Sequence, residues 1–182
     1  VVIVYCHGKS DNIQLWGKIV KEYTKFGDDV LVMDYRGYGK SSGPRNEDFL
    51  YSDAQFAYDY AKEIYGEDKT IVYGRSLGGA FAIKIAAENH PKAIILEAAF
   101  FNLQDIVNRW LPKKVTDKVS PTMTYHFLSN ENISKINVPL YHFHGSKAFV
   151  VPLQSGKKLF EVFEEYNPET EKKFIKIEVE TH

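Results

Sequence analysis

The sequence predicts an α/β fold: a doubly wound, mostly parallel sheet with helices on both faces. Three observations lead to this prediction. Short apolar, β-branched runs recur along the 182 residues, stretches of helical length separate them, and most runs are apolar at successive positions. Continuous apolar runs are typical of strands buried on both faces of a parallel sheet. Alternation of strand and helix with short connections favours right-handed crossovers and a sheet covered on both sides.

Six segments are predicted as strands from their β-branched and apolar content. The last of them places Lys176 and Glu178 on one side, which indicates a strand at the edge of the sheet. In chain order the six segments are residues 1–5, 30–33, 71–73, 93–96, 140–143 and 174–179.

Four segments between these strands are predicted as helices from their apolar spacing. The last helix has Pro152 near its start, where the missing N–H of proline costs nothing. The four segments are residues 14–26, 51–65, 77–89 and 153–166.

Residues 101–137 form a connection longer than those usual between elements of a compact domain. Long ordered insertions are often lids or binding loops. We therefore predict one domain over residues 1–182, with a short lid-like insertion at 101–137; packing that merely covers the sheet is the alternative. The residues that mark the segment are Trp110, Pro112, Pro121, Tyr125 and Phe127.

Composition excludes several classes of protein. The net charge is -1 and no long run of one sign occurs, so nothing suggests binding to nucleic acid or to an anionic membrane. The single cysteine, Cys6, cannot form an internal disulfide, and we expect a buried structural thiol. No apolar stretch approaches the roughly 18 residues of a membrane span, and no signal peptide is visible. A cytoplasmic protein with a small or local substrate is expected.

The segment Gly74-Arg75-Ser76-Leu77-Gly78 has the pattern G-x-S-x-G between a predicted strand and a predicted helix. In that context the chain turns sharply, the serine is strained and exposed, and the glycines let neighbouring backbone approach. The alternatives are a glycine-rich turn with a serine of no function, or a phosphate-binding loop. The earlier segment 37–43 does not fit the nucleotide-binding pattern G-x-x-x-x-G-K-[ST], because Asp34 stands where its first glycine is required.

Two backbone N–H groups are predicted to stabilise an oxyanion beside Ser76. The helix after Ser76 directs its positive end and its free N–H groups at that position, and Leu77 supplies the first donor. The turn His7-Gly8-Lys9 ends the first predicted strand, and a backbone N–H after such a turn often supplies the second donor. We assign it to Lys9, with an ordinary strand-end turn as the alternative.

Five segments together resemble the α/β-hydrolase superfamily and cover nearly the whole chain. They occur in the family's chain order: VVIVYCHGKSDN, DYRGYGKSSG, YGRSLGGAFAIKIA, IILEAAFFNL and VPLYHFHGSKAFVVP. They look like the branch of serine aminopeptidase-like and prolyl oligopeptidase-like hydrolases, which also contains acyl-protein thioesterases that remove palmitate. The resemblance implies the α/β-hydrolase fold, with further strands before Val1 and a helix after His182 in complete members. The chain therefore resembles a member trimmed at both ends.

The resemblance also implies a catalytic triad in the chain order serine, acid, histidine. His182 follows the last predicted strand and matches the histidine, but the acid position is occupied by Ala148, which cannot orient an imidazole. Three explanations stay open: an engineered substitution, a natural loss, or an acid at the end of another strand. Glu97 is the candidate for that third case, with Asp105 a weaker one and a structural role as the alternative for Glu97.

The predicted reaction is attack by Ser76 on an ester, thioester or amide carbonyl, with His182 as general base and then acid. No cofactor or metal is required, and the partner is a small-molecule or acyl substrate. Loss of the triad acid typically lowers turnover about 10⁴-fold. A non-catalytic hydrolase-fold binding protein, which Ala148 favours, is the alternative, and an acyltransferase is a third possibility. The sequence predicts no oligomeric state.

The remaining histidines lack metal-ligand spacing and are expected to be structural. They are His90, His126, His142 and His144. Three polar residues are expected to hold the loop after the second predicted strand in place, with contact to a substrate as the alternative; they are Arg36, Tyr38 and Asp53.

Overall fold

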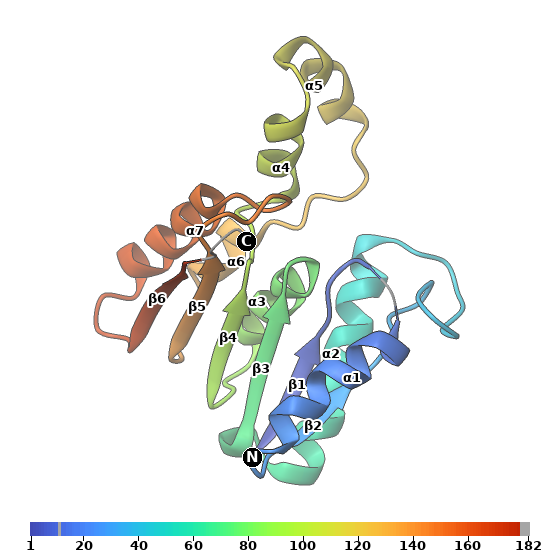
Figure 1. The fold of residues 1–182 in the computed structure, drawn as a ribbon, viewed down its shortest axis with the longest axis vertical. Helices are drawn as coiled ribbons and strands as arrows, with labels where there is room; N and C mark the ends of the chain where they lie inside the picture. Colours follow the sequence, from blue (N-terminus) through green and yellow to red (C-terminus); the bar gives the residue numbers. More distant parts are fainter. Residues whose placement is uncertain (11, 179–182) are drawn as a thin grey trace.

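The structure is a computed structural model that describes residues 1–10 and 12–178. Within these residues the chain forms a six-stranded sheet in the order β2-β1-β3-β4-β5-β6, and every neighbouring pair is parallel (Figure 1). Each predicted strand is present with ends shifted by at most two residues. The strands are β1 Val2–Cys6, β2 Asp29–Val32, β3 Thr70–Arg75, β4 Ala93–Glu97, β5 Leu140–Gly145 and β6 Lys172–Ile177.

The four predicted helices are also present, as α1 Ile13–Thr24, α2 Glu47–Tyr65, α3 Leu77–Glu88 and α7 Leu153–Tyr166. Helix α2 begins four residues before the predicted start. The side chain of Asn46 accepts a hydrogen bond from the Phe49 N–H at 2.8 Å, and Glu47 and Asp48 occupy the first turn. A capping asparagine and acidic first-turn residues both stabilise a helix start, so polar residues rather than apolar spacing set this boundary.

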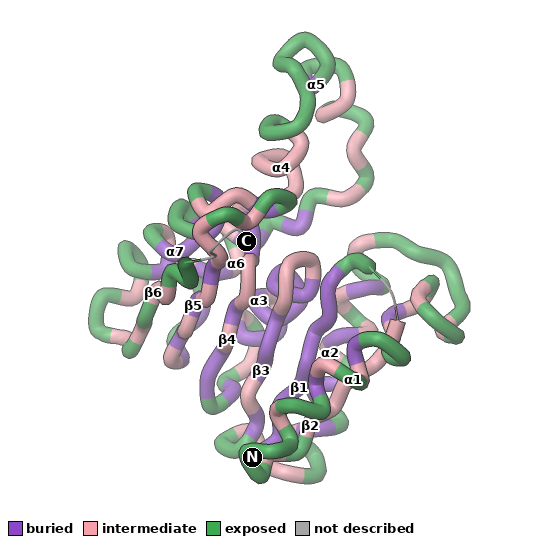
Figure 2. The backbone as a smooth tube through the Cα atoms, viewed as in Figure 1, coloured by how far each residue is buried: buried purple, intermediate pink, exposed green. Residues whose placement is uncertain are grey.

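Alternate residues of each central strand pack on opposite faces of the sheet. Val2 and Val4 of β1 face the larger core with α2, α3 and α7, whereas Ile3 and Tyr5 pack with Trp16 of α1. This confirms the predicted two-sided covering (Figure 1). Buried residues concentrate on β1, β3, β4 and α3 (Figure 2), while β6 is a half-exposed edge strand, as predicted.

The single cysteine lies in the larger core. Cys6 is 2 % exposed, and burial raises the pKa of its thiol to about 12. A thiol that stays protonated is a poor nucleophile, so the expected structural role is consistent with this environment.

The segment 101–137 contains short helices that the sequence pattern did not predict. They are α4 Leu103–Trp110, α5 Lys113–Val119, the 3₁₀ turn η2 Ser120–Thr122 and α6 Ser129–Ile133, and a further 3₁₀ turn, η1 Glu67–Lys69, follows α2. Helix α6 packs against α3 and α7, whereas α4 and α5 project beyond the carboxyl ends of the strands (Figure 1). Elements of three to eight residues are too short for an apolar period to be recognised. No helix in the described part of the chain is long and apolar enough to cross a bilayer.

Candidate active site

Ser76 occupies a strained turn between β3 and α3. Its φ of 51° and ψ of -115° lie in a region that non-glycine residues rarely adopt. Two backbone hydrogen bonds hold the turn: the Ser76 N–H donates to the Glu97 carbonyl at 2.8 Å, and the Ser76 carbonyl accepts from the Gly79 N–H at 2.9 Å. The turn therefore has the geometry that the G-x-S-x-G pattern predicts.

Glycine is required on both sides of this turn because backbone atoms of neighbouring elements lie where a side chain would begin. A Cβ on Gly74 would meet the Gly78 carbonyl oxygen, and a Cβ on Gly78 would overlap the carbonyl oxygen of Cys6 at the end of β1. The neighbours are backbone atoms of a central strand and a helix, which cannot give way as a flexible side chain can. The missing side chains let α3 begin at the ends of β1 and β3.

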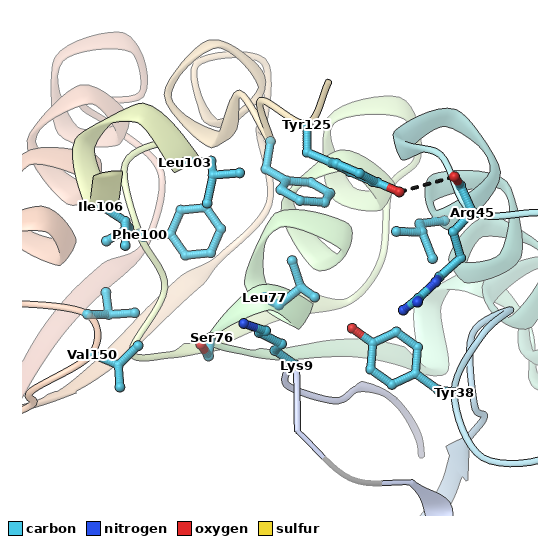
Figure 3. Close-up of a pocket in the computed structure, with 13 residues that line it drawn as sticks. Lys9, Tyr38, Arg45, Ser76, Leu77, Phe100, Leu103, Ile106, Tyr125 and Val150 are labelled. Atoms are coloured by element: carbon cyan, nitrogen blue, oxygen red, sulfur yellow. Dashed lines mark hydrogen bonds between the residues drawn. The ribbon is translucent and has the colours of Figure 1, made fainter. Parts of the chain in front are cut away.

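The two predicted oxyanion donors lie with Ser76 in one pocket. Lys9, Ser76 and Leu77 all contribute to its lining (Figure 3). Leu77 is the first residue of α3, so its N–H has no partner inside the helix. Within residues 1–10 and 12–178 neither the Lys9 N–H nor the Leu77 N–H donates a hydrogen bond. Both groups are therefore available to a substrate oxygen.

A buried histidine supports the turn that carries Lys9. His7 is fully buried, its Nδ1 lies 2.8 Å from the Gly8 carbonyl, and its Nε2 lies 3.6 Å from a carboxylate oxygen of Asp34. Its ring also packs against Tyr35, with ring centroids 4.4 Å apart. Burial lowers the pKa of His7, which favours the neutral imidazole. Sequence analysis used His7 only as part of the turn and missed this supporting contact.

The pocket has a volume of about 520 Å³ and two chemically different sides (Figure 3). One side is apolar and the other carries polar groups and a cation. Among the described residues that line the pocket, none is acidic. The apolar side consists of Phe100, Leu103, Ile106 and Val150; the polar side consists of Tyr38, Arg45 and Tyr125.

The segment 101–137 contributes to both sides of the pocket. Leu103 and Ile106 come from α4, and Tyr125, whose hydroxyl donates to the Arg45 carbonyl at 3.1 Å, follows η2. Arg45, Phe100 and Val150 were missed by the sequence analysis. Each lies in a different connection between elements, and no local pattern distinguishes such residues from ordinary loop residues.

The loop after β2 is held as predicted by two of the three residues named for that role. Arg36 donates to Asp53 from Nε at 2.9 Å and from a terminal nitrogen at 2.6 Å. Burial acts to raise the pKa of Asp53, but the hydrogen bonds from Arg36 outweigh it, and the pKa lies below its usual value. The third residue, Tyr38, lines the pocket, where contact with a substrate is the alternative role for these residues.

The three candidate acid positions differ in their contacts. Ala148 lies in the turn after β5, where its N–H donates to the Gly145 carbonyl at 3.2 Å. The Glu97 carboxylate accepts from the Tyr73 hydroxyl at 2.9 Å and lies 3.3 Å from Arg75 Nε. Asp105 accepts from the Ser155 hydroxyl and lies 2.9 Å from Lys158 Nζ. Both alternative carboxylates are thus engaged by neighbours.

No base for the Ser76 hydroxyl lies in the described part of the chain. Within residues 1–10 and 12–178, no hydrogen bond to the Ser76 hydroxyl is formed, and no histidine lines its pocket. The predicted base, His182, lies outside the described residues, as do the other residues that follow Glu178. The structure therefore brings Ser76 together with the two residues predicted as oxyanion donors, Lys9 and Leu77, whereas the predicted proton acceptor lies outside the described residues.

Two histidines on β5 form a buried pair behind the turn that contains Ala148. His144 Nε2 donates to the Val151 carbonyl at 3.0 Å, and its Nδ1 lies 3.4 Å from His142 Nε2. Burial favours the neutral form of His144, whose single ring proton is then on Nε2, so Nδ1 carries no proton and can accept from His142. Burial lowers the pKa of both residues, that of His142 to about 3 with a smaller contribution from His144. In the described residues no three His, Cys, Asp or Glu side chains are grouped to hold a metal ion.

Comparison with known proteins gives consistent results. Residues 1–131 match the family model described as serine aminopeptidase, S33. The chain is 32 % identical over 183 residues to the lysophosphatidylserine lipase ABHD12 of Danio rerio, covering 88 % of this chain and 47 % of that protein. It is 33 % identical over 156 residues to the protein bem46 of Schizosaccharomyces pombe, covering 82 % and 52 %. The chain thus spans about half the length of these curated relatives.

Solved structures show the same fold at lower sequence identity. An esterase of Pyrococcus furiosus superposes with a TM-score of 0.74 at 20 % identity, covering 97 % of this chain and 72 % of that one. An α/β hydrolase of Vibrio vulnificus superposes with a TM-score of 0.83 at 20 % identity, covering 97 % and 66 %.

Proposed function

Because the chain belongs to the serine aminopeptidase S33 family and has the α/β-hydrolase fold, we propose that it hydrolyses an ester, thioester or amide bond through an acyl-enzyme on Ser76. The observation that carries the proposal is the geometry of the turn at Ser76. A strained serine at the end of a buried strand lies in one pocket with Lys9 and Leu77, whose N–H groups donate no hydrogen bond within the described part of the chain. A binding protein gains nothing from such strain, whereas a nucleophile gains exposure and oxyanion stabilisation.

The proposed reaction proceeds in two steps. The Ser76 hydroxyl oxygen attacks the carbonyl carbon, its proton passes to a basic nitrogen, and the carbonyl oxygen becomes an oxyanion between the Lys9 and Leu77 N–H groups. The proton then passes to the leaving alcohol, thiol or amine as its bond to carbon breaks. In the second step water gives a proton to the same nitrogen and attacks the acyl carbon; the bond from that carbon to the Ser76 oxygen then breaks, the nitrogen returns the proton to Ser76, and the acid is released. We assign the basic nitrogen to His182.

The two sides of the pocket support a substrate class. We propose that an acyl chain lies along Phe100, Leu103 and Ile106, because apolar side chains exclude water from that side. The leaving group then lies near Arg45 and Lys9, where two cations and no acidic lining residue in the described chain favour an anionic group. The relative in Danio rerio carries the name of a lysophosphatidylserine lipase. An acyl ester of an anionic lysophospholipid is the class we propose.

The segment 101–137 is proposed to act as a lid. Leu103 and Ile106 on one limb, and Tyr125 and Phe127 on the other, form part of the pocket walls. A segment that supplies both walls can control entry and shape the acyl site, which is the usual role of a long ordered insertion.

Ala148 is proposed to limit the rate. Glu97 and Asp105 have other partners, so neither is a free carboxylate that could orient an imidazole. The same observation supports the second candidate function, a non-catalytic binding protein that retains the pocket.

The test is hydrolysis of p-nitrophenyl butyrate by the unmodified chain, Ser76→Ala and Ala148→Asp. Slow hydrolysis by the unmodified chain, its loss in Ser76→Ala and a large increase in Ala148→Asp are the expected results. Background rates in all three proteins, with folding confirmed by circular dichroism, would contradict the proposal and favour the binding protein.

A further inference from the structure

A group of large apolar side chains is exposed beside the mouth of the pocket. Trp110 at the end of α4 lies against Phe149 in the turn after β5, with ring centroids 4.6 Å apart. Phe149 is 75 % exposed and its neighbour Val150 is 64 % exposed, while Leu111 follows Trp110 and is also exposed. We call these four residues the apolar rim. Its members come from two segments nearly forty residues apart in sequence, so the rim exists only in the folded chain.

The projection of α4 and α5 next to the apolar rim is basic. Residues 108–118 carry Arg109, Lys113, Lys114 and Lys118 against one acidic residue, Asp117, and all five are exposed. Lys113 pairs with Asp117 at 2.9 Å, whereas Arg109, Lys114 and Lys118 form no ion pair with a residue of the described chain. The net charge of -1 over the whole chain conceals this local excess, which is why the charge balance gave no indication of a membrane.

The apolar rim adjoins the apolar side of the pocket. Val150 belongs to both, and α4 supplies Ile106 to the pocket and Trp110 to the rim. Figure 3 shows Val150 and Ile106 on the same side of the pocket, to the left of Ser76 in this view. An acyl chain that left an apolar phase at the rim would therefore meet apolar side chains along its path to Ser76.

From these observations we propose that the apolar rim and the basic projection form a docking surface for an anionic lipid membrane. Tryptophan and phenylalanine insert at the boundary between head groups and acyl chains, and lysine and arginine beside them attract anionic head groups. A protein partner is the less favoured occupant, because three basic residues on the adjoining projection have no ion-pair partner in the described chain, and Val150 of the rim also lines an apolar pocket. The inference goes beyond the proposed hydrolysis and does not depend on Ser76 chemistry.

The experiment uses the Ser76→Ala protein, so that failure of catalysis and failure of docking are distinguished. The probes are vesicles of phosphatidylcholine alone and vesicles with about 30 % phosphatidylserine. The chain has two tryptophans, and Trp16 is already buried, so a blue shift of the emission on binding reports Trp110. We expect co-sedimentation with the anionic vesicles, accompanied by a blue shift that Trp110→Phe removes while binding persists.

Matched variants separate the apolar and the charged contributions. Phe149→Ser is expected to lower the partition coefficient about tenfold. Its control, Phe56→Ser, changes an α2 phenylalanine that is 72 % exposed and is expected to have no effect. The double change Lys114→Glu with Lys118→Glu is expected to weaken binding to anionic vesicles only. Its control is Lys18→Glu with Lys21→Glu on α1.

Three results would overturn the proposal: no binding to anionic vesicles, equal losses in Phe149→Ser and Phe56→Ser, or binding without a change in tryptophan emission. If the protein does not bind vesicles but elutes as a dimer on gel filtration, and the Trp110 emission is blue-shifted in that dimer, the surface is a protein contact instead.

Discussion

The two halves of the candidate site lie at the carboxyl ends of one sheet but are built in different ways. The nucleophile half consists of the turn 7–9, β3 and the start of α3, and close backbone contacts fix it at Gly74 and Gly78. The acid half consists of β5 and the loop 146–152, and a buried histidine pair and the side chain of residue 148 determine it. The comparison indicates that backbone contacts determine the first half, whereas the second depends on side chains, including the alanine that stands at the predicted acid position.

Placing a carboxylate at residue 148 of the acid half gives the largest expected effect, which is on turnover. Ala148→Asp should raise the turnover of a p-nitrophenyl ester by about 10⁴-fold, because an acid at this position holds the base in the correct tautomer. Steady-state kinetics measure the change, and Ala148→Asn, which has the same size without the charge, is the control. An equal increase with asparagine would show that size rather than charge limits the site.

Adding one methyl group tests the backbone of the nucleophile half. Gly78→Ala should lower the free energy of unfolding by about 1–3 kcal/mol, because the new Cβ overlaps the Cys6 carbonyl. Urea denaturation measures this loss. Gly17→Ala on α1 is the matched control: a Cβ there meets nothing within 4 Å, and the change should stabilise the protein by roughly 0.5–1 kcal/mol. Equal effects of the two changes would contradict the close packing at the turn.

Lowering the pH should reduce the free energy of unfolding through the buried histidines of the acid half. The pKa of His142 is about 3 in the folded protein, and an exposed histidine in the unfolded chain titrates near 6.5. Between these values the unfolded state binds more protons, so stability is lost as pH falls from about 6.5, at no more than about 1.4 kcal/mol per pH unit for each histidine. Urea denaturation between about pH 7 and about pH 5 measures the slope. The slope of the free energy of unfolding against pH should be smaller in His142→Gln. An unchanged slope would exclude His142 as the source of the pH dependence.

The sequence was sufficient to predict elements with strong local signals. The sheet, four long helices and the turn at Ser76 each depend on residues close together in the chain, such as the glycines around Ser76. The pocket was harder to predict, because Arg45, Phe100 and Val150 come from separate connections that only the folded chain brings together. The same is true of Asp105, a candidate acid by its position, which the structure pairs with Ser155 and Lys158 of α7.

Labelling with a fluorophosphonate tests the central claim most directly, since the reagent bonds to a nucleophilic serine without needing the natural substrate. Peptide mapping of the labelled protein should place the adduct on Ser76, with faster labelling in Ala148→Asp and none in Ser76→Ala. Labelling of another serine, or equal labelling in Ser76→Ala, would contradict the assignment of Ser76 as the nucleophile.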